Sequence, residues 1–284
     1  MTRGTRRRLA EAALAFALAA SPVAASAQAP GLGAGAELVD PDALRVCADP
    51  RNLPFSDEKG DGFENKIAAL LGQKLGKPVT YAYFPQVIGF VRNTLNAFRC
   101  DVVVGVAVGD DLVQTTNPYY HTTYALVVKK GSDLEGITSL EDPRLKNKRI
   151  GVVAGTPPAT VMVHDDLMDR AKPYPLTIDT RYDAPAHDMV NDIVSGAVDA
   201  GVLWGPIAGY WATHEHLPLA IAPLLKEPGV RMDFLIAMGV RHSDQNWKRE
   251  LNKFISANQG AINKILTDYG VPLLDEQGKP ITPQ

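Results

Sequence analysis

The feature that most constrains this chain is an alternation of short apolar segments with amphipathic ones, which runs once and then starts again. In the first half it predicts strands over 44–48, 79–84 and 101–108, with helices from residue 64 and over 87–98 between them. Gly76 and Pro78 are expected to end the first helix. Because parallel strands need crossover connections, this β-α-β-α-β order predicts a mostly parallel sheet with helices on both faces.

The same pattern returns in the second half of the chain. It predicts strands over 148–153, 176–179, 198–203 and 234–240, and helices over 157–168, 184–195 and 246–269. Two such units in tandem predict two α/β lobes, with lobe 1 over 41–120, lobe 2 over 121–230 and a return segment of lobe 1 over 231–284. Ligands of open α/β sheets bind beyond the carboxyl ends of the strands, so both lobes should aim their loops at one cleft.

The first residues are typical of an export signal. Three consecutive arginines at 6–8 precede an apolar run over 9–20, and the small residues Ala25 and Ala27 form an A-x-A cleavage site just before Gln28. The apolar run is shorter than the roughly 20 residues that a membrane span needs. We therefore predict a signal peptide over 1–27, a flexible leader over 28–40, and a mature protein in the periplasm that has no membrane span.

Charge and composition exclude several classes of protein. The chain has 29 basic and 32 acidic residues, a net charge of −3, and 45% of its residues are hydrophobic. A nucleic-acid partner would require a clustered basic surface, which a mildly acidic chain does not favour. The hydrophobic content is ordinary for a folded protein and too high for disorder.

The chain has two cysteines, Cys47 and Cys100. In an oxidising compartment an even pair favours a disulfide, and the alternative is two buried free thiols. The first and third strands neighbour each other in a 2-1-3 strand order, which would bring the two cysteines together.

The sequence lacks the common catalytic and cofactor motifs. It has no phosphate-binding loop, no dinucleotide fingerprint, no nucleophile elbow and no paired-histidine zinc motif. We therefore expect no catalytic residue, no metal and no cofactor in this chain, and a binding function in place of an enzymatic one.

Several loops and strand ends resemble those of solute-binding proteins of the amino-acid family. The matching segments include 44–55, Gly62-Phe63-Glu64, 100–105, 117–120 and 150–156, and the resemblance spans nearly all of residues 42–270. It implies a two-lobe periplasmic-binding-protein clamshell of the α/β class, joined by two hinge segments. By this resemblance the hinges fall near 119–123 and 229–233, and Tyr119 and Tyr120 serve the first of them.

Two departures from that family affect its ligand site. The position that matches its carboxylate-binding arginine is Leu112, and the position of its ammonium-binding aspartate is Trp204. A carboxylate buried without a partner is costly, so these changes predict that α-amino acids are not the ligand. Arg51, Arg181 and Arg231 remain as alternative partners for a carboxylate.

A narrower resemblance is to the quinoprotein-dehydrogenase-associated J proteins, which are encoded beside periplasmic methanol dehydrogenases. The segments 45–50, 92–97 with Cys100-Asp101, and 203–206 carry it. It implies a periplasmic accessory of a PQQ-dependent methanol dehydrogenase, with that enzyme or its cytochrome as partner and the metal held in the enzyme. The alternatives are a transporter subunit that carries a small organic solute, and an enzyme such as a dehydratase that uses Glu64 as its acid.

Five residues are the candidates for the cleft, where a ligand or a partner would bind: Asp49, Phe55, Glu64, Thr156 and Trp204. Each has a structural alternative. Phe55 could pack under its loop and Trp204 could belong to the core. Thr156 could cap the following helix in place of binding an anion, and Glu64 is also expected at a helix N-terminus because of the helix dipole.

Overall fold

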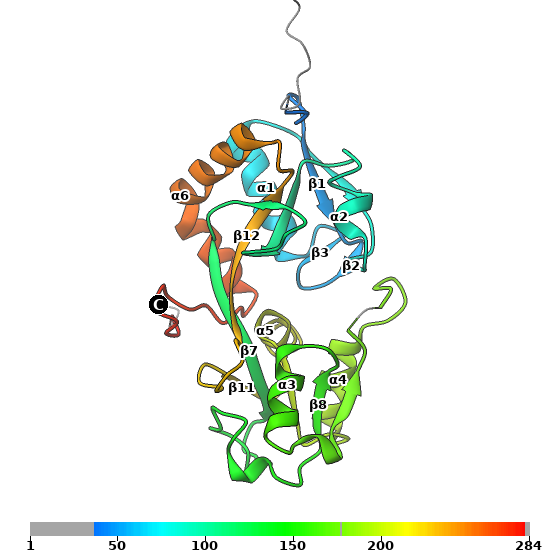
Figure 1. Ribbon diagram of the computed structural model, residues 1–284, viewed down its shortest axis with the longest axis vertical. Helices are drawn as coiled ribbons and strands as arrows, with labels where there is room; N and C mark the ends of the chain where they lie inside the picture. Colours follow the sequence, from blue (N-terminus) through cyan, green and yellow to red (C-terminus); the bar gives the residue numbers. More distant parts are fainter. Residues whose placement is uncertain (1–36, 177, 282–284) are drawn as a thin grey trace, which may run out of the picture. The chain divides into compact units, whose positions relative to one another are not determined.

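A computed structural model describes residues 37–176 and 178–281, which form two α/β lobes (Figure 1). The predicted signal peptide and residues 28–36 of the predicted leader lie outside the described residues. In the part of the chain that the structure describes, no helix is long and apolar enough to cross a membrane.

Lobe 1 is built on four main strands in the order β4 (Val79–Tyr83), β1 (Leu44–Ala48), β5 (Val102–Ala107) and β12 (Asp233–Val240). The first three strands are parallel, and β12 runs antiparallel to β5. The order β4-β1-β5 is the predicted 2-1-3 arrangement, and it results from two crossovers through helices.

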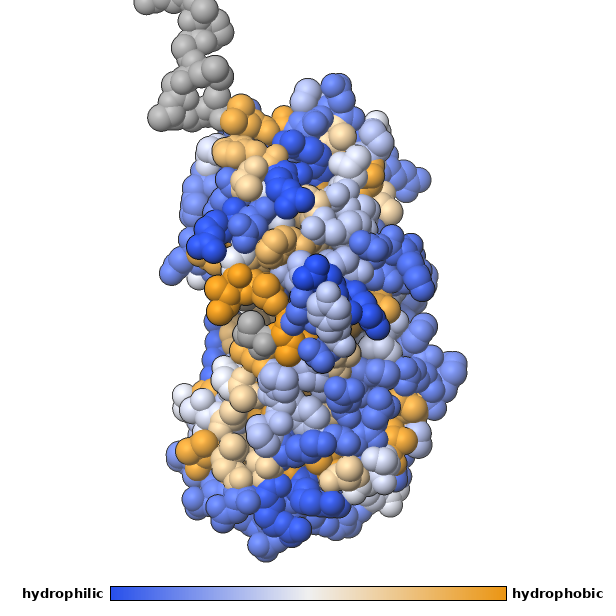
Figure 2. Space-filling view, turned by 90° about the vertical axis from the view of Figure 1, so that its right-hand side faces the viewer, coloured by the Kyte–Doolittle hydropathy of each residue, from blue (hydrophilic) through white to orange (hydrophobic). Residues whose placement is uncertain are grey.

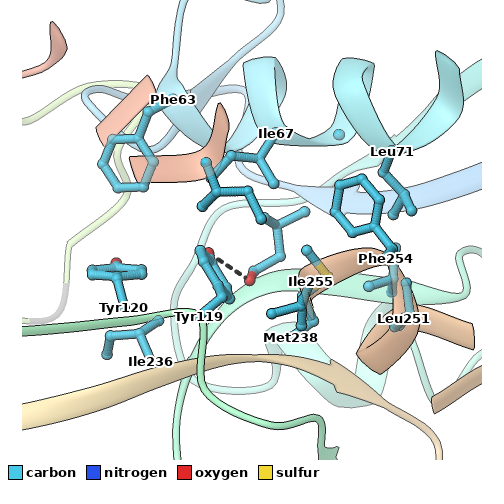
Figure 3. Packing of buried hydrophobic residues seen from close by; sticks show 14 of the residues in the cluster. Phe63, Ile67, Leu71, Tyr119, Tyr120, Ile236, Met238, Leu251, Phe254 and Ile255 are labelled. Atoms are coloured by element: carbon cyan, nitrogen blue, oxygen red, sulfur yellow. Dashed lines mark hydrogen bonds between the residues drawn. The ribbon is translucent and has the colours of Figure 1, made fainter. Parts of the chain in front are cut away.

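The two faces of the lobe 1 sheet bury different parts of the sequence. One face packs against α1 (Phe63–Leu75) and the long helix α6 (Gln245–Asp268), and Figure 3 shows Ile67, Met238 and Phe254 meeting there. The other face carries Cys47, Val103 and the short helix α2 (Phe90–Asn93). Because side chains alternate along a strand, Val102 and Val104 of β5 point to the first face and Val103 to the second.

Lobe 2 has the strand order β7 (Tyr120–Lys129), β10 (Ala200–Trp204), β8 (Ile150–Val153) and β9 (Lys172–Tyr174), and β11 (Leu219–Pro223) pairs with β7. One face carries α3 (Pro157–His164), and the other carries α4 (Pro185–Ser195) and α5 (Gly205–His214). Gly196 ends α4 in the left-handed conformation, as its place after the apolar repeat predicts.

Strand β7 belongs to both lobes. The start of β7 pairs with Asp233–Ile236 of β12, and the rest of β7 pairs with β10 and β11. The two lobes are therefore parts of one ten-stranded sheet. Three short strands complete the set: β2 (Arg51–Asn52), β3 (Ser56–Asp57) and β6 (Gln114–Thr115).

The disulfide between Cys47 and Cys100 is present, with 5.3 Å between the two Cα atoms. Cys47 lies on β1, and Cys100 lies just before β5, the strand that pairs with β1. The prediction of a disulfide across neighbouring strands is thus confirmed.

Helix α5 and the segment after α6 approach each other through glycines. A Cβ atom on Gly209 would lie 1.8 Å from the carbonyl oxygen of Gly270, and one on Gly205 would lie 2.6 Å from Pro272. Gly270 also has a φ of +71°, a conformation that other residues rarely adopt. This contact holds a lobe 2 helix against the C-terminal segment.

A buried ion network joins the N-terminal strand to the end of β12. Asp101 is 1% exposed and accepts hydrogen bonds from Arg45 at 2.7 Å and from Arg241 at 2.6 Å. Glu37, at the end of the predicted leader, accepts hydrogen bonds from the first backbone N–H groups of α6. The last residues of that segment, 37–40, therefore make specific contacts.

Two predicted elements are wrong in extent or place. The helix predicted over 87–98 shrinks to α2, because Gly89 is left-handed and the Thr94 hydroxyl donates back to the Phe90 carbonyl. The strand predicted over 176–179 lies earlier, at β9, where it pairs with the edge of β8. The pattern also missed β7, which is the longest strand of the structure.

Candidate binding cleft

A cavity of about 470 Å³ opens where loops of both lobes meet. Lobe 1 contributes the side chains of Arg51, Asn52, Leu53 and Gln86, and lobe 2 contributes the ends of its strands and three helix starts. The aromatic residues of the lining are Tyr124, Tyr182, Trp204 and Trp211. A concave, mostly apolar site with a few polar groups is the usual form of a small-molecule site.

Trp204 lies at the end of β10, in the position just before helix α5. Its ring meets Tyr124 edge-on, with 5.0 Å between ring centres, and Phe234 at 5.8 Å. Trp204 is partly buried and also lines the cavity. Trp204 therefore both lines the cavity, as expected of a cleft residue, and packs against other aromatic rings, as expected of a core residue.

A second aromatic wall comes from the facing helices α4 and α5. The His187 ring stacks on Trp211 with 4.0 Å between ring centres, and its Nε2 lies 3.1 Å from a Glu215 oxygen. The neighbouring Tyr210 is only 5% exposed and stacks on Tyr269, with 5.8 Å between ring centres. Of the two neighbouring aromatic residues, only Trp211 lines the cavity.

Thr156 lines the cavity and occupies the N-cap position of helix α3, but its side chain makes no capping hydrogen bond. Its hydroxyl donates instead to the carbonyl of Val153 at 2.6 Å, so the alternative that this hydroxyl caps the helix is wrong. The helix begins with Pro157 and Pro158, which have no N–H to offer. This helix start is therefore a poor site for an anion.

Asp49 lies outside the lining of the cavity and fastens one lobe to the other. It is 1% exposed, and its carboxylate accepts from the backbone of Arg51 at 2.8 Å and of Gln86 at 2.6 Å. The Thr180 hydroxyl of lobe 2 also lies 2.8 Å from each of its oxygens. Beside this contact, the Arg51 guanidinium donates to the carbonyl of Arg181 at 2.8 Å.

Phe55 and Glu64 also lie outside the lining. The Phe55 ring packs edge-on against Phe63, with 5.3 Å between ring centres. The Glu64 carboxylate lies over the end of β5, where a Cβ atom on Gly105 would come within 2.1 Å of it. Burial, with a further contribution from the charge of Asp49, raises the pKa of Glu64 to about 8.

Tyr119 and Tyr120 are buried in the core of lobe 1, at the point where the chain enters β7 (Figure 3). The Tyr119 hydroxyl donates to the carbonyl of Val104 at 2.9 Å. The change of strand partners along β7 comes three residues later, between Thr123 and Tyr124.

The residues considered for carboxylate binding have separate surroundings. Leu112 is 62% exposed and does not line the cavity. Arg181 pairs with Asp179 at 2.6 Å, and Arg231 donates to the carbonyl of Asp233. Arg51 is the one of the three arginines that lines the cavity.

The pattern analysis missed the loop that covers the cavity, between β9 and α4. This loop contributes Leu176, Ile178, Thr180 and Tyr182; the pattern placed the first two in a predicted strand over 176–179 and gave the other two no role. The position of this loop beside the cavity depends on the contact between Thr180 and Asp49, which are far apart in the sequence. Among the described residues, no group of three or more histidine, cysteine, aspartate or glutamate side chains could hold a metal ion.

Comparison with known proteins assigns a family to this architecture. The model of the bacterial extracellular solute-binding proteins, family 3, matches residues 44–271. Protein MoxJ of Methylorubrum extorquens is 32% identical over 95% of this chain and 97% of its own length, and protein MoxJ of Paracoccus denitrificans is 27% identical over 84% and 91%. The crystal structure of the periplasmic binding protein XoxJ from Methylobacterium extorquens AM1 has a TM-score of 0.71 at 39% identity, over 82% of this chain and 100% of that one.

Proposed function

The chain belongs to the bacterial extracellular solute-binding proteins, family 3, and on that premise we propose that it is a periplasmic accessory that binds a PQQ-dependent methanol dehydrogenase. Its similarity to MoxJ and XoxJ over most of each chain supports this function in methanol oxidation. In this role the protein matures or activates the dehydrogenase by binding it, and carries out no catalysis of its own. The cytochrome of that enzyme is a second candidate partner.

The observation that carries the proposal is the state of Asp49 and Trp204. An amino-acid carrier needs an acid that is available to the ligand's ammonium group, but the oxygens of Asp49 already accept from Thr180 and two backbone groups. A tryptophan at 204 supplies no charge, and Leu112 at the matching arginine position is exposed to solvent. Charge recognition of an α-amino acid is therefore unsupported, which favours a partner protein over a transported amino acid.

The surface around the cavity favours contact with another protein. Tyr182 is 78% exposed and Leu176 is 56% exposed, although both belong to the cavity lining. Ile88, two residues after the lining residue Gln86, is 87% exposed. Figure 2 shows hydrophobic residues gathered at mid-height of one face. Tyrosine is among the commonest anchors of protein interfaces, so Tyr182 is the residue to test.

Binding to purified, immobilised methanol dehydrogenase tests the proposal. The wild-type protein should bind saturably, and Tyr182→Ala should bind about tenfold more weakly, or about 1.4 kcal/mol. Val163→Ala is the matched control, because Val163 is a 63% exposed apolar residue of lobe 2 that does not line the cavity. Trp204→Phe tests the cleft floor while keeping an aromatic ring against Tyr124.

The absence of wild-type binding to the dehydrogenase and to its cytochrome would overturn the proposal. Equal losses for Tyr182→Ala and Val163→Ala would place the contact elsewhere on the protein. Saturable binding of an amino acid would instead support the transporter alternative.

A further inference from the structure

We propose that the cavity between the lobes binds a flat aromatic carboxylate that carries no ammonium group. This ligand would be a small molecule, distinct from the dehydrogenase partner, and its binding is measured separately. The inference rests on three observations: the aromatic walls of the cavity, the one arginine in its lining, and the nearby acids Asp49 and Glu215, which already form hydrogen bonds within the protein.

The aromatic walls are held in fixed positions, which suits a flat ligand. Trp204 is braced edge-on by Tyr124 and Phe234, and Trp211 is stacked on His187. Rings that need no reordering present large apolar faces at low entropic cost. At about 470 Å³, the cavity is large enough for a bicyclic ring system with a short side chain.

The charge near the cavity favours an anionic group. Arg51 lines the cavity, and the one described hydrogen bond of its guanidinium goes from Nη1 to the carbonyl of Arg181, a neutral acceptor. The guanidinium keeps further donors in the planar arrangement that matches a carboxylate. The start of α5, at Trp204, also lines the cavity and adds a partial positive potential.

The acids of the region offer little to a ligand's ammonium group. The Asp49 carboxylate is occupied by Thr180 and the backbone, and Glu64 lies outside the lining. Glu215 is engaged with His187. Asp183 is the single acid in the lining; it is exposed and directly precedes the start of α4, where the helix dipole stabilises its charge.

Calorimetric titration with a matched series of naphthalene compounds tests the proposal. The series is 2-naphthylacetate, 2-(2-naphthyl)ethanol and 2-(2-naphthyl)ethylamine, which share a ring system and differ in charge. We expect the acid to bind at least tenfold more tightly than the amine. Arg51→Gln should lower the affinity for the acid at least tenfold and change the affinity for the alcohol by less than twofold. Arg99→Gln, at an exposed arginine of lobe 1, should change neither affinity.

A second variant guards against loss of the fold in Arg51→Gln. Ile207 lines the cavity at the start of α5, so Ile207→Glu places a negative charge there and should reverse the preference toward the amine. Three results would each overturn the proposal: no saturable binding of the acid to wild type, an amine that binds as tightly as the acid, or an equal loss of acid and alcohol in Arg51→Gln. If the wild-type protein still bound the dehydrogenase in such a case, the ligand proposal would be wrong and the proposed function would stand.

Discussion

The hydroxyl of Thr180 lies 2.8 Å from each carboxylate oxygen of Asp49 and donates a shared hydrogen bond to them across the two lobes. This contact fastens the loop before α4, which lines the cavity, to lobe 1. Any ligand that enters from this side must displace or pass that loop.

Removal of this contact should loosen the loop without unfolding the protein. Thr180→Val keeps the shape of the side chain and deletes the donor, so the loop over 175–184 should lose about 1 kcal/mol of stability against local opening. Hydrogen exchange should show faster amide exchange in that loop. The control is Thr80→Val, at an exposed position of β4. Unchanged exchange in Thr180→Val would show that other contacts hold the loop.

The stability of the protein should fall as the pH rises through the neutral range, because of Glu64. The pKa of Glu64 is about 8 in the folded chain, against an ordinary value near 4.5 when unfolded. Between these values the folded state binds more protons than the unfolded state, so the free energy of unfolding decreases with pH, by at most about 1.4 kcal/mol per unit.

Glu64→Gln should remove this decrease, since an amide does not titrate. Urea unfolding at pH 5.5, 7 and 8.5 measures it, with Glu58→Gln at an exposed site as the control. The variant should be more stable than wild type at pH 8.5. Parallel pH profiles for wild type and Glu64→Gln would contradict the assignment.

The glycine contact between α5 and the C-terminal segment should tolerate no added methyl group. Gly209→Ala would place a Cβ atom 1.8 Å from the Gly270 carbonyl oxygen, and the cost of such overpacking is about 3 kcal/mol. Gly260→Ala is the control, because its Cβ meets no atom within 4 Å and alanine favours a helix by about 0.5–1 kcal/mol. Thermal unfolding should move in opposite directions for the two variants, and a neutral Gly209→Ala would mean that the two segments separate easily.

Much of the fold was predictable because local patterns carry it. The apolar repeat from Ile67 predicted α1, and the apolar run before Val108 predicted β5. The disulfide was predicted because the strands next to Cys47 and Cys100 were expected to be neighbours. Strand β7 escaped because its residues follow a crossover and its partners, β10, β11 and β12, come much later in the sequence. Pairing over such distances leaves little trace in a local window.

The cleft was less predictable than the fold. The structure places Thr156 and Trp204 at the cavity, because strand ends and helix starts must meet there. It places Asp49 against Thr180 and Glu64 over Gly105, and both positions depend on contacts with residues distant in sequence. Periodicity predicted a strand over 176–179 in place of the covering loop, and no motif marks Tyr182, so its place at the cavity could be found only in three dimensions.

The chain returns to lobe 1 with β12 only after it has formed lobe 2, and this affects the order in which the two lobes can fold. The inner edge of β5, over 102–107, finds its antiparallel partner only at 233–240, after the whole of lobe 2. During synthesis, lobe 2 has most of its sheet in one uninterrupted stretch of the chain, whereas β5 of lobe 1 keeps an unpaired edge until β12 is made. Such long-range pairing is slow and leaves the edge available for wrong partners. Folding of lobe 1 is therefore the step at which a newly made chain is most exposed to aggregation.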